Sequence, residues 1–340
     1  MNIVVDGMGG DHAPKVVVEG SRFALEQYPA IAKIILTGDE SRLKKEMDAC
    51  GLRGPRVEIL HAPSVVEMHE SSTAAVRGKK DSSITLAADL VKKGGADALV
   101  SAGHTGAAVA ATTVKWRMLP GVDRPGIISP LPAEHGVTQI LDAGANVEAK
   151  PRHLVQYAIM GSVYARAVCG IANPKVGLMS VGEEDEKGTD FTREVFAMLK
   201  GTPGVNFVGN IEGHHLFEGG IDIVVCDGFT GNVVLKTAEA TAKVMTKWIR
   251  HEMKANPLRM LGAVMAKSAF KAVKARGSYE TYGGSPLLGV RGLCIIGHGS
   301  SSAVAVKNAI RVGMEAVQSQ VNNRIEEALA ALQPEPPSSL

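Results

Sequence analysis

The sequence predicts an α/β protein built on a doubly wound, mostly parallel β-sheet, with a helical hairpin inserted late in the chain. Three observations predict this fold class. Short apolar runs typical of buried strands alternate with helical patterns along the chain. At least five of these runs end in a small glycine-rich polar loop that is followed by a helical pattern. Between residues 232 and 276, two helical stretches instead follow each other without an intervening strand.

The alternation of strand and helix patterns extends over nearly the whole chain. The runs expected to form strands are residues 2–6, 33–37, 57–60, 97–101, 126–129, 138–142, 175–181, 205–208, 222–226 and 293–296. The helical patterns are residues 14–28, 40–50, 83–93, 106–116, 152–168, 189–200, 232–254, 257–275 and 303–332. We expect residues 1–332 to form a single α/β domain that contains the hairpin, and the tail 333–340 to be disordered.

The five glycine-rich loops are the expected functional part of this fold. Parallel strands end at one edge of a sheet, where open α/β proteins bind ligands. Glycine lets backbone N–H groups approach an anion, and helix N-termini add a favourable partial charge. The loops therefore predict one site, for phosphate, assembled from distant segments. The candidate residues in these loops are Gly9, Gly10, Asp11, His12, Ser101, Gly103, His104, Thr105, Gly106, Asp142, Asn146, Asp227, Phe229, Asn232, His298, Gly299 and Ser300.

The composition indicates a globular protein with an aliphatic core. Hydrophobic residues make up 45% of the chain and aromatic residues only 4%. The four cysteines lie far apart and include no C-x-x-C pair, which favours small buried residues. A strand is expected from residue 2, and no apolar stretch reaches the roughly 18 to 20 residues of a spanning helix. We therefore expect an intracellular protein without a signal peptide or a transmembrane segment.

The charge is concentrated in the inserted hairpin, expected at about residues 232–276. The whole chain has a net charge of +2, but residues 236–276 hold ten Lys or Arg against two acids, a net charge of +8. The expected apolar face of the second helix comprises Leu258, Leu261, Val264, Met265, Ala269, Ala272 and Val273, with Lys267, Lys271 and Lys274 on the opposite side. The hairpin is either a docked helix with a solvated basic face or a surface for an acidic protein or anionic lipid, and the charge segregation favours the second interpretation.

Several common functional signatures are missing. The chain has no G-x-x-x-x-G-K-[ST] phosphate loop and no G-x-G-x-x-G after its first strand. His251-Glu252 is not followed by a histidine at 255, and there is no G-x-S-x-G nucleophile elbow. These absences argue against a P-loop nucleotidase, a standard dinucleotide fold, a helical zinc site and an α/β-hydrolase. We expect neither a metal nor another cofactor.

Some of the candidate residues also have a purely structural interpretation. Asp11 can cap the helix expected near Pro14, although capping does not account for His12 and the two glycines. The loop 101–106 can be an ordinary capped turn, and Asp142 a turn residue. The acidic run from Glu183 to Gly188 is typical of a solvated loop, but it holds one lysine, Lys187, where an ammonium can bind phosphate or stabilise an oxyanion.

Seven motifs in order carry a resemblance to a known family. They are Met8-Gly-Gly-Asp11, Ser101-Ala-Gly-x-Thr-Gly-Ala107, Asp142-x-Gly-Ala-Asn146, residues 155–163, Gly182-Glu183-Glu184 with Lys187-Gly188, Cys226-Asp-Gly-Phe-Thr-Gly-Asn-Val233 and His298-Gly-Ser300. Together they closely resemble the bacterial phosphate acyltransferases (acyl-ACP:phosphate acyltransferases) of phospholipid synthesis. Each motif is weak alone, but the set covers residues 1–325 and is highly specific.

The resemblance implies an activity, a fold and partners. The family makes acyl phosphate from fatty acyl-acyl carrier protein (acyl-ACP) and inorganic phosphate, and a glycerol-3-phosphate acyltransferase then uses the acyl phosphate for phosphatidic acid synthesis. Its fold is similar to that of isocitrate and isopropylmalate dehydrogenases and phosphate acetyltransferase. The proteins are homodimers in the cytoplasm, attached peripherally to the inner face of the membrane through the hairpin. The family's proposed catalytic lysine falls on Lys187, and no nucleic-acid partner is implied.

The chain departs from the family pattern at two places. His104 stands where the family usually has asparagine, so an imidazole must take over any role of that amide. In the loop from Glu67 to Arg77, Ser72 stands where proline is expected. Arg77 and Lys79 remain candidate phosphate ligands.

These residues predict a reaction without a covalent enzyme intermediate, because phosphate is itself a nucleophile at pH 7. We expect the loops at 9–12, 101–106 and 298–300 to bind phosphate, Lys187 to steady negative charge, and Asp227 and Asn232 to shape the pocket mouth. The enzymatic alternative is a phosphate acetyltransferase-like enzyme that uses acyl-CoA; a decarboxylating dehydrogenase of the same fold lacks a dinucleotide fingerprint here. The non-enzymatic alternative is a scaffold that binds carrier protein or membrane.

Overall fold

The protein is described here by a computed structural model that covers residues 1–67, 70, 72–277 and 279–332. The strands are β1 (Asn2–Asp6), β2 (Lys33–Gly38), β3 (Val57–His61), β4 (Ala98–Ser101), β5 (Gly126–Pro132), β6 (Val137–Leu141), β7 (Lys175–Met179), β8 (Asn206–Ile211), β9 (Ile223–Val225), β10 (Ser285–Leu288) and β11 (Cys294–Ile296). The helices are α1 (Lys15–Gln27), α2 (Glu40–Cys50), α3 (Ser72–Gly78), α4 (Ser83–Lys92), α5 (Thr105–Trp116), α6 (Pro151–Ala167), α7 (Asp190–Lys200), α8 (His215–Glu218), α9 (Gly228–Met253), α10 (Pro257–Met265), α11 (Lys267–Gly277), α12 (Tyr279–Tyr282), α13 (Ala303–Gln318) and α14 (Val321–Ala330). The expected tail, 333–340, lies outside the described residues.

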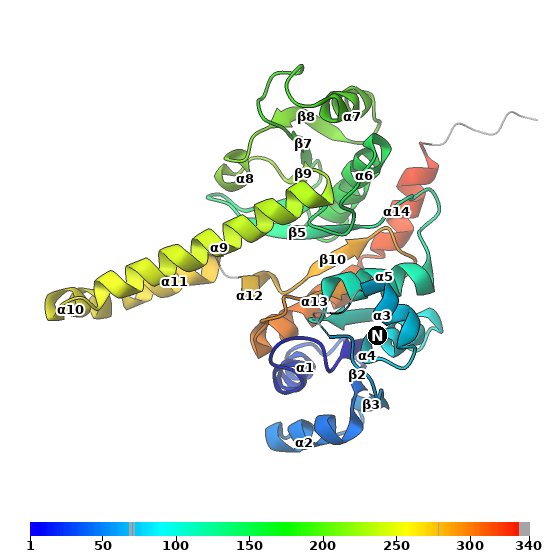
Figure 1. The fold of residues 1–340 in the computed structure, drawn as a ribbon, viewed down its shortest axis with the longest axis vertical. Helices are drawn as coiled ribbons and strands as arrows, with labels where there is room; N and C mark the ends of the chain where they lie inside the picture. The colour runs from blue at the N-terminus through cyan, green and yellow to red at the C-terminus, as the bar shows by residue number, and fades with distance from the viewer. Residues whose placement is uncertain (68–69, 71, 278, 333–340) are drawn as a thin grey trace, which may run out of the picture.

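Helices cover both faces of one sheet, as the alternating pattern predicts (Figure 1). Successive strand residues point to opposite faces. In β1, Ile3 and Val5 pack into a cluster with α1, α2 and α13, whereas Val4 packs into the cluster on the other face with α3, α4 and α5. In the second half of the sheet, α6, α7 and α14 cover one face, and α8 and the start of α9 lie on the other.

The direction of the strands reverses within the sheet. The spatial order is β3-β2-β1-β4-β11-β10-β5-β6-β9-β7-β8. The strands β1, β2, β3, β4 and β11 are parallel, but β10 is antiparallel to both β11 and β5. Because β5 is in turn antiparallel to β6, the strands β6, β9, β7 and β8 run opposite to β1, β4 and β11.

The reversal corrects the prediction that all five glycine-rich loops leave the same edge of the sheet. The loops after β1, β4 and β11 leave one edge, and those after β6, β7 and β9 leave the other. The sequence patterns did not identify β10, a four-residue strand, Ser-Pro-Leu-Leu, whose proline is unfavourable in a strand interior. The reversal itself comes from the hairpin of β5 and β6, whose two strands the sequence patterns treated as members of one parallel series.

The inserted hairpin is a long arm that projects from the sheet (Figure 1). Its first helix, α9, has 26 residues, and only Gly228 and Gly231 of them are buried. The second helix was predicted as one segment over 257–275, which is wrong: it is divided at Ala266 into α10 and α11. The expected single apolar face is therefore split between two helices. The pattern at 303–332 is likewise two helices, because Gln320 adopts a left-handed conformation between α13 and α14.

No helix within the described residues is both long enough and apolar enough to cross a membrane.

Candidate functional site

Three glycine-rich loops, at 9–12, 101–106 and 298–300, meet at one edge of the sheet. The N–H of Asp11 donates to the carbonyl of Gly299 at 2.8 Å, which joins the first loop to the third. A Cβ at Gly10 would stand 3.0 Å from that carbonyl oxygen, and one at Gly9 would stand 2.8 Å from the backbone N of Gly103. The backbones therefore approach so closely that glycine is required, and the predicted assembly of these three loops is correct.

A buried carboxylate, Asp6, holds two of these loops together. Its Oδ2 accepts from Ser101 Oγ at 2.8 Å, and its Oδ1 accepts from the N–H of Met8 at 3.3 Å. Burial raises the pKa of Asp6, although hydrogen bonds from Ser83 and Ser101 oppose the rise. Asp6 was missing from the predicted site. The available signal was an acid at the last position of a buried strand, directly before the glycines.

Three helices begin directly after the joined loops: α1 at Lys15, α5 at Thr105 and α13 at Ala303. Their N-termini therefore lie at the same edge of the sheet, where their partial positive charges favour an anion. Asp11 does not cap α1, since Pro14 holds the cap position without a side-chain hydrogen bond. The capping explanation for Asp11 is thus wrong, and Asp11, His12 and Thr105 are exposed at this edge.

His104 performs the structural task of an asparagine at the start of α5. Its Nδ1 accepts from the N–H of Ala107 at 3.3 Å, as an asparagine side-chain oxygen does at a helix N-cap. Because Nδ1 is the acceptor, the neutral ring carries its proton on Nε2. The substitution thus keeps the cap and adds an N–H donor beside the loop.

His298, in the third loop, contacts the arm. Its Nε2 lies 3.4 Å from Oε2 of Glu239, which α9 supplies. Glu239 is a further residue that the sequence patterns did not identify, since one acid in a basic helix carries no distinctive signal. The arm is therefore tied to the loop that is expected to bind phosphate.

The candidates at 142–146 and 227–232 form a second group. Asp142 is fully buried and accepts from the N–H groups of Ile127, Gly144, Ala145 and Asn146. Burial raises its pKa, and these hydrogen bonds oppose the rise. Its carboxylate thus organises the loop, which favours the interpretation as a turn residue, and a direct role in substrate binding stays a prediction. Asn146 is held by contacts with Tyr157 and His153.

The other members of the second group start the arm. Asp227 caps α9 by accepting from the N–H of Thr230 at 2.9 Å and from its hydroxyl at 2.7 Å. The side chain of Asn232 lies against Gly144, and Phe229 is exposed. Since α9 begins in this group and reaches His298 about three turns later, one helix connects the two groups of candidate residues.

Lys187 is exposed on the loop after β7. In the part of the chain that the structure describes, its ammonium makes no hydrogen bond or ion pair, and the loop after β7 leaves the edge of the sheet opposite to the joined loops at 9–12, 101–106 and 298–300. The loop itself is tethered elsewhere: Asn210 Nδ2 donates to the carbonyl of Glu184 at 2.8 Å, and Glu183 pairs with His215 at 3.1 Å.

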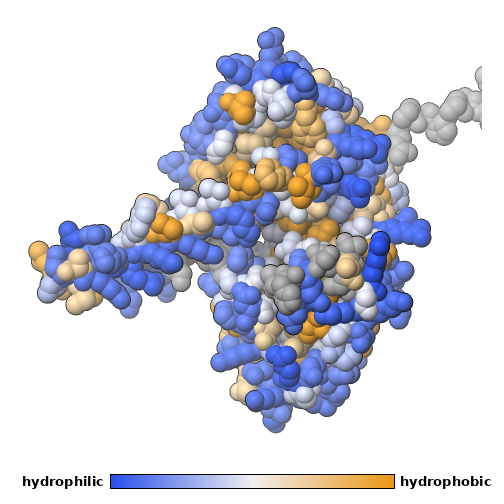
Figure 2. All heavy atoms as spheres, viewed as in Figure 1, coloured by the Kyte–Doolittle hydropathy of each residue, from blue (hydrophilic) through white to orange (hydrophobic). Residues whose placement is uncertain are grey.

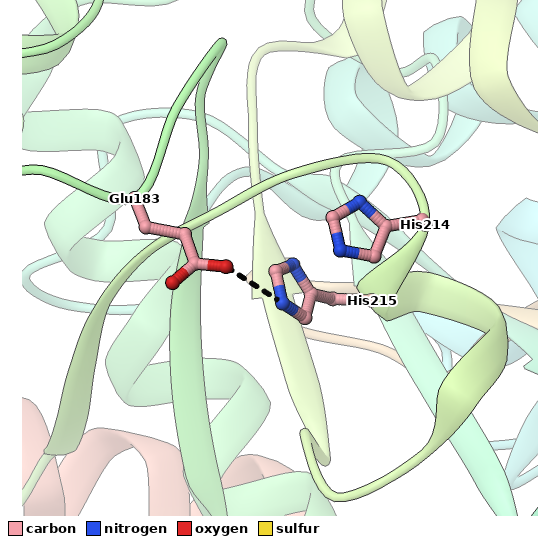
Figure 3. A group of neighbouring side chains, drawn as sticks. All are labelled: Glu183, His214 and His215. Atoms are coloured by element: carbon pink, nitrogen blue, oxygen red, sulfur yellow. Dashed lines mark ion pairs between the residues drawn. The ribbon is translucent and has the colours of Figure 1, made fainter.

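Glu183, His214 and His215 form a cluster beside this loop (Figure 3). His215 Nδ1 accepts from the N–H of Glu212 at 3.1 Å, so the neutral ring carries its proton on Nε2, toward Glu183. The ring centroids of the two imidazoles are 4.0 Å apart with an interplanar angle of 34°, and one ligand atom from each of the three residues lies within 4.8 Å of the others. The pairing of Glu183 with His215 tethers the Lys187 loop to α8.

The two basic candidates near residues 67–79 differ in their surroundings. Lys79 is engaged by Glu70, at 2.7 Å, and by the carbonyl of Val65. Arg77 is exposed in the last turn of α3, which packs against α5. Of the two, Arg77 is the one better placed to meet a ligand near the start of α5.

Comparison with known proteins identifies relatives of the whole chain. The family model of the fatty acid synthesis protein matches residues 1–324. A curated phosphate acyltransferase from Akkermansia muciniphila is 58% identical over 337 residues, which cover 98% of this chain and 97% of that protein.

Two solved structures share the fold. A phosphotransacetylase from Streptococcus pyogenes aligns with a TM-score of 0.64 and 17% identity over 94% of each chain. A 4-hydroxythreonine-4-phosphate dehydrogenase from Klebsiella pneumoniae aligns with a TM-score of 0.54 and 13% identity, covering 94% of this chain and 99% of that one. At these identities the likeness concerns the fold alone, and it confirms the predicted fold class.

The cap at His104 leads to a paired stability prediction. His104→Asn should unfold at nearly the wild-type urea concentration, because the amide oxygen can accept from Ala107. His104→Ala should lose about 1 kcal/mol of unfolding free energy, the typical cost of a lost N-cap. Urea titration followed by circular dichroism measures both. Equal losses in the two variants would contradict the assigned capping role.

Proposed function

The chain belongs to the fatty acid synthesis protein family, and from that premise we propose that it transfers a fatty acyl group from acyl-ACP to inorganic phosphate, forming acyl phosphate for phospholipid synthesis. That the protein is a phosphate acyltransferase follows from its curated relatives, which carry that name at identities up to 58%. Acyl-ACP as the donor, and the partners of the enzyme, are what we propose beyond this activity. The observation that carries the chemistry is the meeting of three glycine-rich loops at three helix N-termini.

Phosphate binding at the joined loops accounts for the chemistry. Phosphate held by backbone N–H groups and helix N-termini is placed as a nucleophile, and it attacks the thioester carbonyl directly. Positioning and stabilisation of the oxyanion are then the main tasks of the protein. In this proposal Lys187 supplies a positive charge at the transition state, Arg77 contributes to the phosphate side, and Phe229 and Asn232 line the entrance.

The arm supports a protein donor over acyl-CoA. Carrier protein is strongly acidic, and residues 236–276 carry a net charge of +8. Complementary charge speeds encounter and fixes orientation. Acyl-CoA offers the same pantetheine thioester without an acidic protein, so an acyl-CoA-dependent enzyme would not need a basic surface of this extent to bind its donor. A non-catalytic scaffold would leave the joined glycine loops without one.

Membrane attachment is proposed for the tip of the arm. On α10, Leu258 is 79% exposed, Leu261 59%, Val264 65% and Met265 78%, and α11 adds the exposed Lys267 and Lys271. The side chain of the third predicted lysine, Lys274, lies outside the described part of the structure. Figure 2 shows apolar residues at the tip of an otherwise mostly hydrophilic arm. Apolar side chains that enter the headgroup boundary beside basic residues are typical of peripheral binding to anionic lipid.

This attachment fits a cytoplasmic protein at the inner face of the membrane. There it would act as a homodimer and hand acyl phosphate to a glycerol-3-phosphate acyltransferase. The exposed apolar residues of α9, among them Met245, Trp248 and Ile249, are available for contact between subunits.

The activity is tested by thiol release. Purified protein should release free thiol from long-chain acyl-ACP only when phosphate is present, because phosphate is the nucleophile. Matched acyl-ACP and acyl-CoA, assayed with a thiol reagent and by acyl phosphate trapping with hydroxylamine, measure the donor preference. Equal thiol release without phosphate would identify a hydrolase, and no turnover of either donor would favour the scaffold.

Removal of the Lys187 ammonium should slow the reaction. If it stabilises charge in the transition state, Lys187→Ala should lower kcat by roughly 10²- to 10³-fold, the typical loss for one oxyanion-stabilising donor. The exposed loop position should leave folding intact. Lys200→Ala is the matched control, since its ammonium pairs with Asp185 at 3.3 Å and has no assigned role. A near-normal kcat in folded Lys187→Ala would make this residue a solvated loop lysine.

Membrane attachment should depend on the tip of the arm. Leu261→Glu with Met265→Glu should release the protein from anionic liposomes, because it removes apolar burial and adds repulsion; each basic residue near the surface contributes about 1 kcal/mol. High salt should also weaken binding. Turnover of soluble acyl-ACP should change less. Met198→Glu with Val208→Glu, two exposed apolar positions outside the arm, is the control. Normal sedimentation of the tip variant would leave carrier-protein docking as the role of the arm.

A further inference from the structure

A chain of three polar side chains links the arm to the joined loops. Ser300 Oγ lies 2.8 Å from Nδ1 of His298, and Nε2 of the same ring lies 3.4 Å from Oε2 of Glu239. A hydroxyl, an imidazole and a carboxylate in series have the composition of a proton relay. The first two come from the loop after β11, and the third comes from α9.

The backbone determines the direction of the hydrogen bonds in this chain. The N–H of Ser300 donates to Nδ1 of His298 at 3.1 Å, so that nitrogen is an acceptor. The neutral ring therefore carries its proton on Nε2, which faces the Glu239 carboxylate, and Ser300 Oγ donates to Nδ1. The ring is thus held as a base toward Ser300 and as a donor toward Glu239.

Glu239 is suited to stabilise a charged imidazole. Its side chain is only 21% exposed, and Lys236 Nζ lies 3.1 Å from the same oxygen. Burial by itself would raise the pKa of Glu239, but the hydrogen bonds from His298 and Lys236 outweigh it and hold the pKa at about 2. The carboxylate consequently stays ionised throughout the range in which a histidine titrates.

We propose that Ser300 and His298 form the proton relay of the acyl-transfer reaction, and that Glu239 is the residue that positions His298. The inference rests on the proposed function, since it describes proton movement at that site. It assigns Ser300 a place beside phosphate, which is consistent with the bond from Asp11 N–H to the adjacent carbonyl of Gly299.

The relay accounts for every proton in the reaction. An oxygen of HPO₄²⁻ attacks the thioester carbon, the C–O bond forms, and the C–S bond breaks with its electron pair remaining on sulfur. The phosphate hydroxyl passes its proton to Ser300 Oγ as the Ser300 proton moves to His298 Nδ1, which makes an imidazolium beside Glu239. The imidazolium returns one proton through Ser300 to the thiolate, so that no net proton is taken up or released.

The charged group in contact with His298 comes from α9: Glu239 lies 3.4 Å from ring Nε2 and in turn pairs with Lys236. The loop after β1 meets the loop of His298 through the backbone, where Asp11 N–H donates to the carbonyl of Gly299. Because Glu239 lies on the arm, displacement of α9 would also move the Glu239 carboxylate away from His298.

The test compares Glu239→Gln with the wild-type enzyme. The amide keeps the shape and removes the charge, so kcat should fall by about tenfold or more while KM for phosphate and acyl-ACP stays nearly constant. Because the imidazolium loses its counter-charge, the acidic limb of the kcat–pH profile should move to lower pH by about one unit. Glu315→Gln is the control: this half-buried glutamate pairs with Arg311 on α13 and should leave kcat and the profile unchanged.

Two further variants test whether the three residues act as one unit. Glu239→Gln combined with His298→Asn should be no slower than His298→Asn alone, since members of one relay are not additive. Additive losses, or a lower kcat in Glu239→Gln without movement of the pH limb, would overturn the relay and leave Glu239 as an anchor of the arm. A long-lived acyl adduct on Ser300, detected by mass spectrometry after incubation without phosphate, would also overturn it, because Ser300 would then be the nucleophile.

A measurement without turnover separates this inference from the proposed function. In ¹⁵N NMR of the imidazole, His298 should be the Nε2–H tautomer in the wild-type protein, and Glu239→Gln should alter that signal. The opposite tautomer in the wild-type protein would overturn the relay even if acyl phosphate is formed. A correct tautomer in a protein that forms no acyl phosphate from any donor would overturn the proposed function and, with it, the assigned proton transfer.

Discussion

Because β5 runs antiparallel to β6, while β10 is antiparallel to both β11 and β5, the two halves of the sheet end at opposite edges. The polar loops are consequently divided into two groups, and a single strand edge cannot bring them together. The connection is made by α9, which begins at the capping residue Asp227 in one group and presents Glu239 to His298 in the other. The position of this helix is thus the constraint on which a composite site depends.

The start of α9 packs closely against the loop that contains Asp142. A Cβ at Gly231 would stand 2.0 Å from the carbonyl oxygen of Asp142, and one at Gly228 would stand 2.7 Å from a carboxylate oxygen of Asp142. The buried Asp142 carboxylate holds the loop on which the helix rests through four backbone N–H groups. Beyond this base the helix is exposed for most of its length. The N-terminal end of α9 is therefore held by close packing, and the rest of the helix is exposed to solvent.

The electrostatics of the joined loops rely more on the backbone than on side-chain cations. Helix N-termini and glycine N–H groups are already in place, whereas Lys187 is exposed and, among the described residues, makes no hydrogen bond or ion pair with these loops. An ion pair at 4 Å is worth about 1 kcal/mol in bulk water and about 4 kcal/mol at an effective dielectric constant of 20. A catalytic contribution from Lys187 therefore requires that bound substrate exclude water and that the loop tethered by Glu183 and His215 approach the phosphate.

The sequence by itself determined the fold class, most of the strands and the three loops that meet around Gly9, Ser101 and Gly299. These features depend on local patterns: apolar runs of strand length, glycine where backbones touch, and helix starts directly afterwards. It also determined the basic arm, since charge is additive along a chain. Only the tertiary structure decided the insertion of β10 between β11 and β5, the full burial of Asp142 and the pairing of Glu239 with His298. The strand insertion and the ion pair depend on contacts between residues far apart in the chain, and burial depends on the packing around the loop. A short strand with a proline, or one of two acids in a basic helix, has no local pattern that reveals its partner.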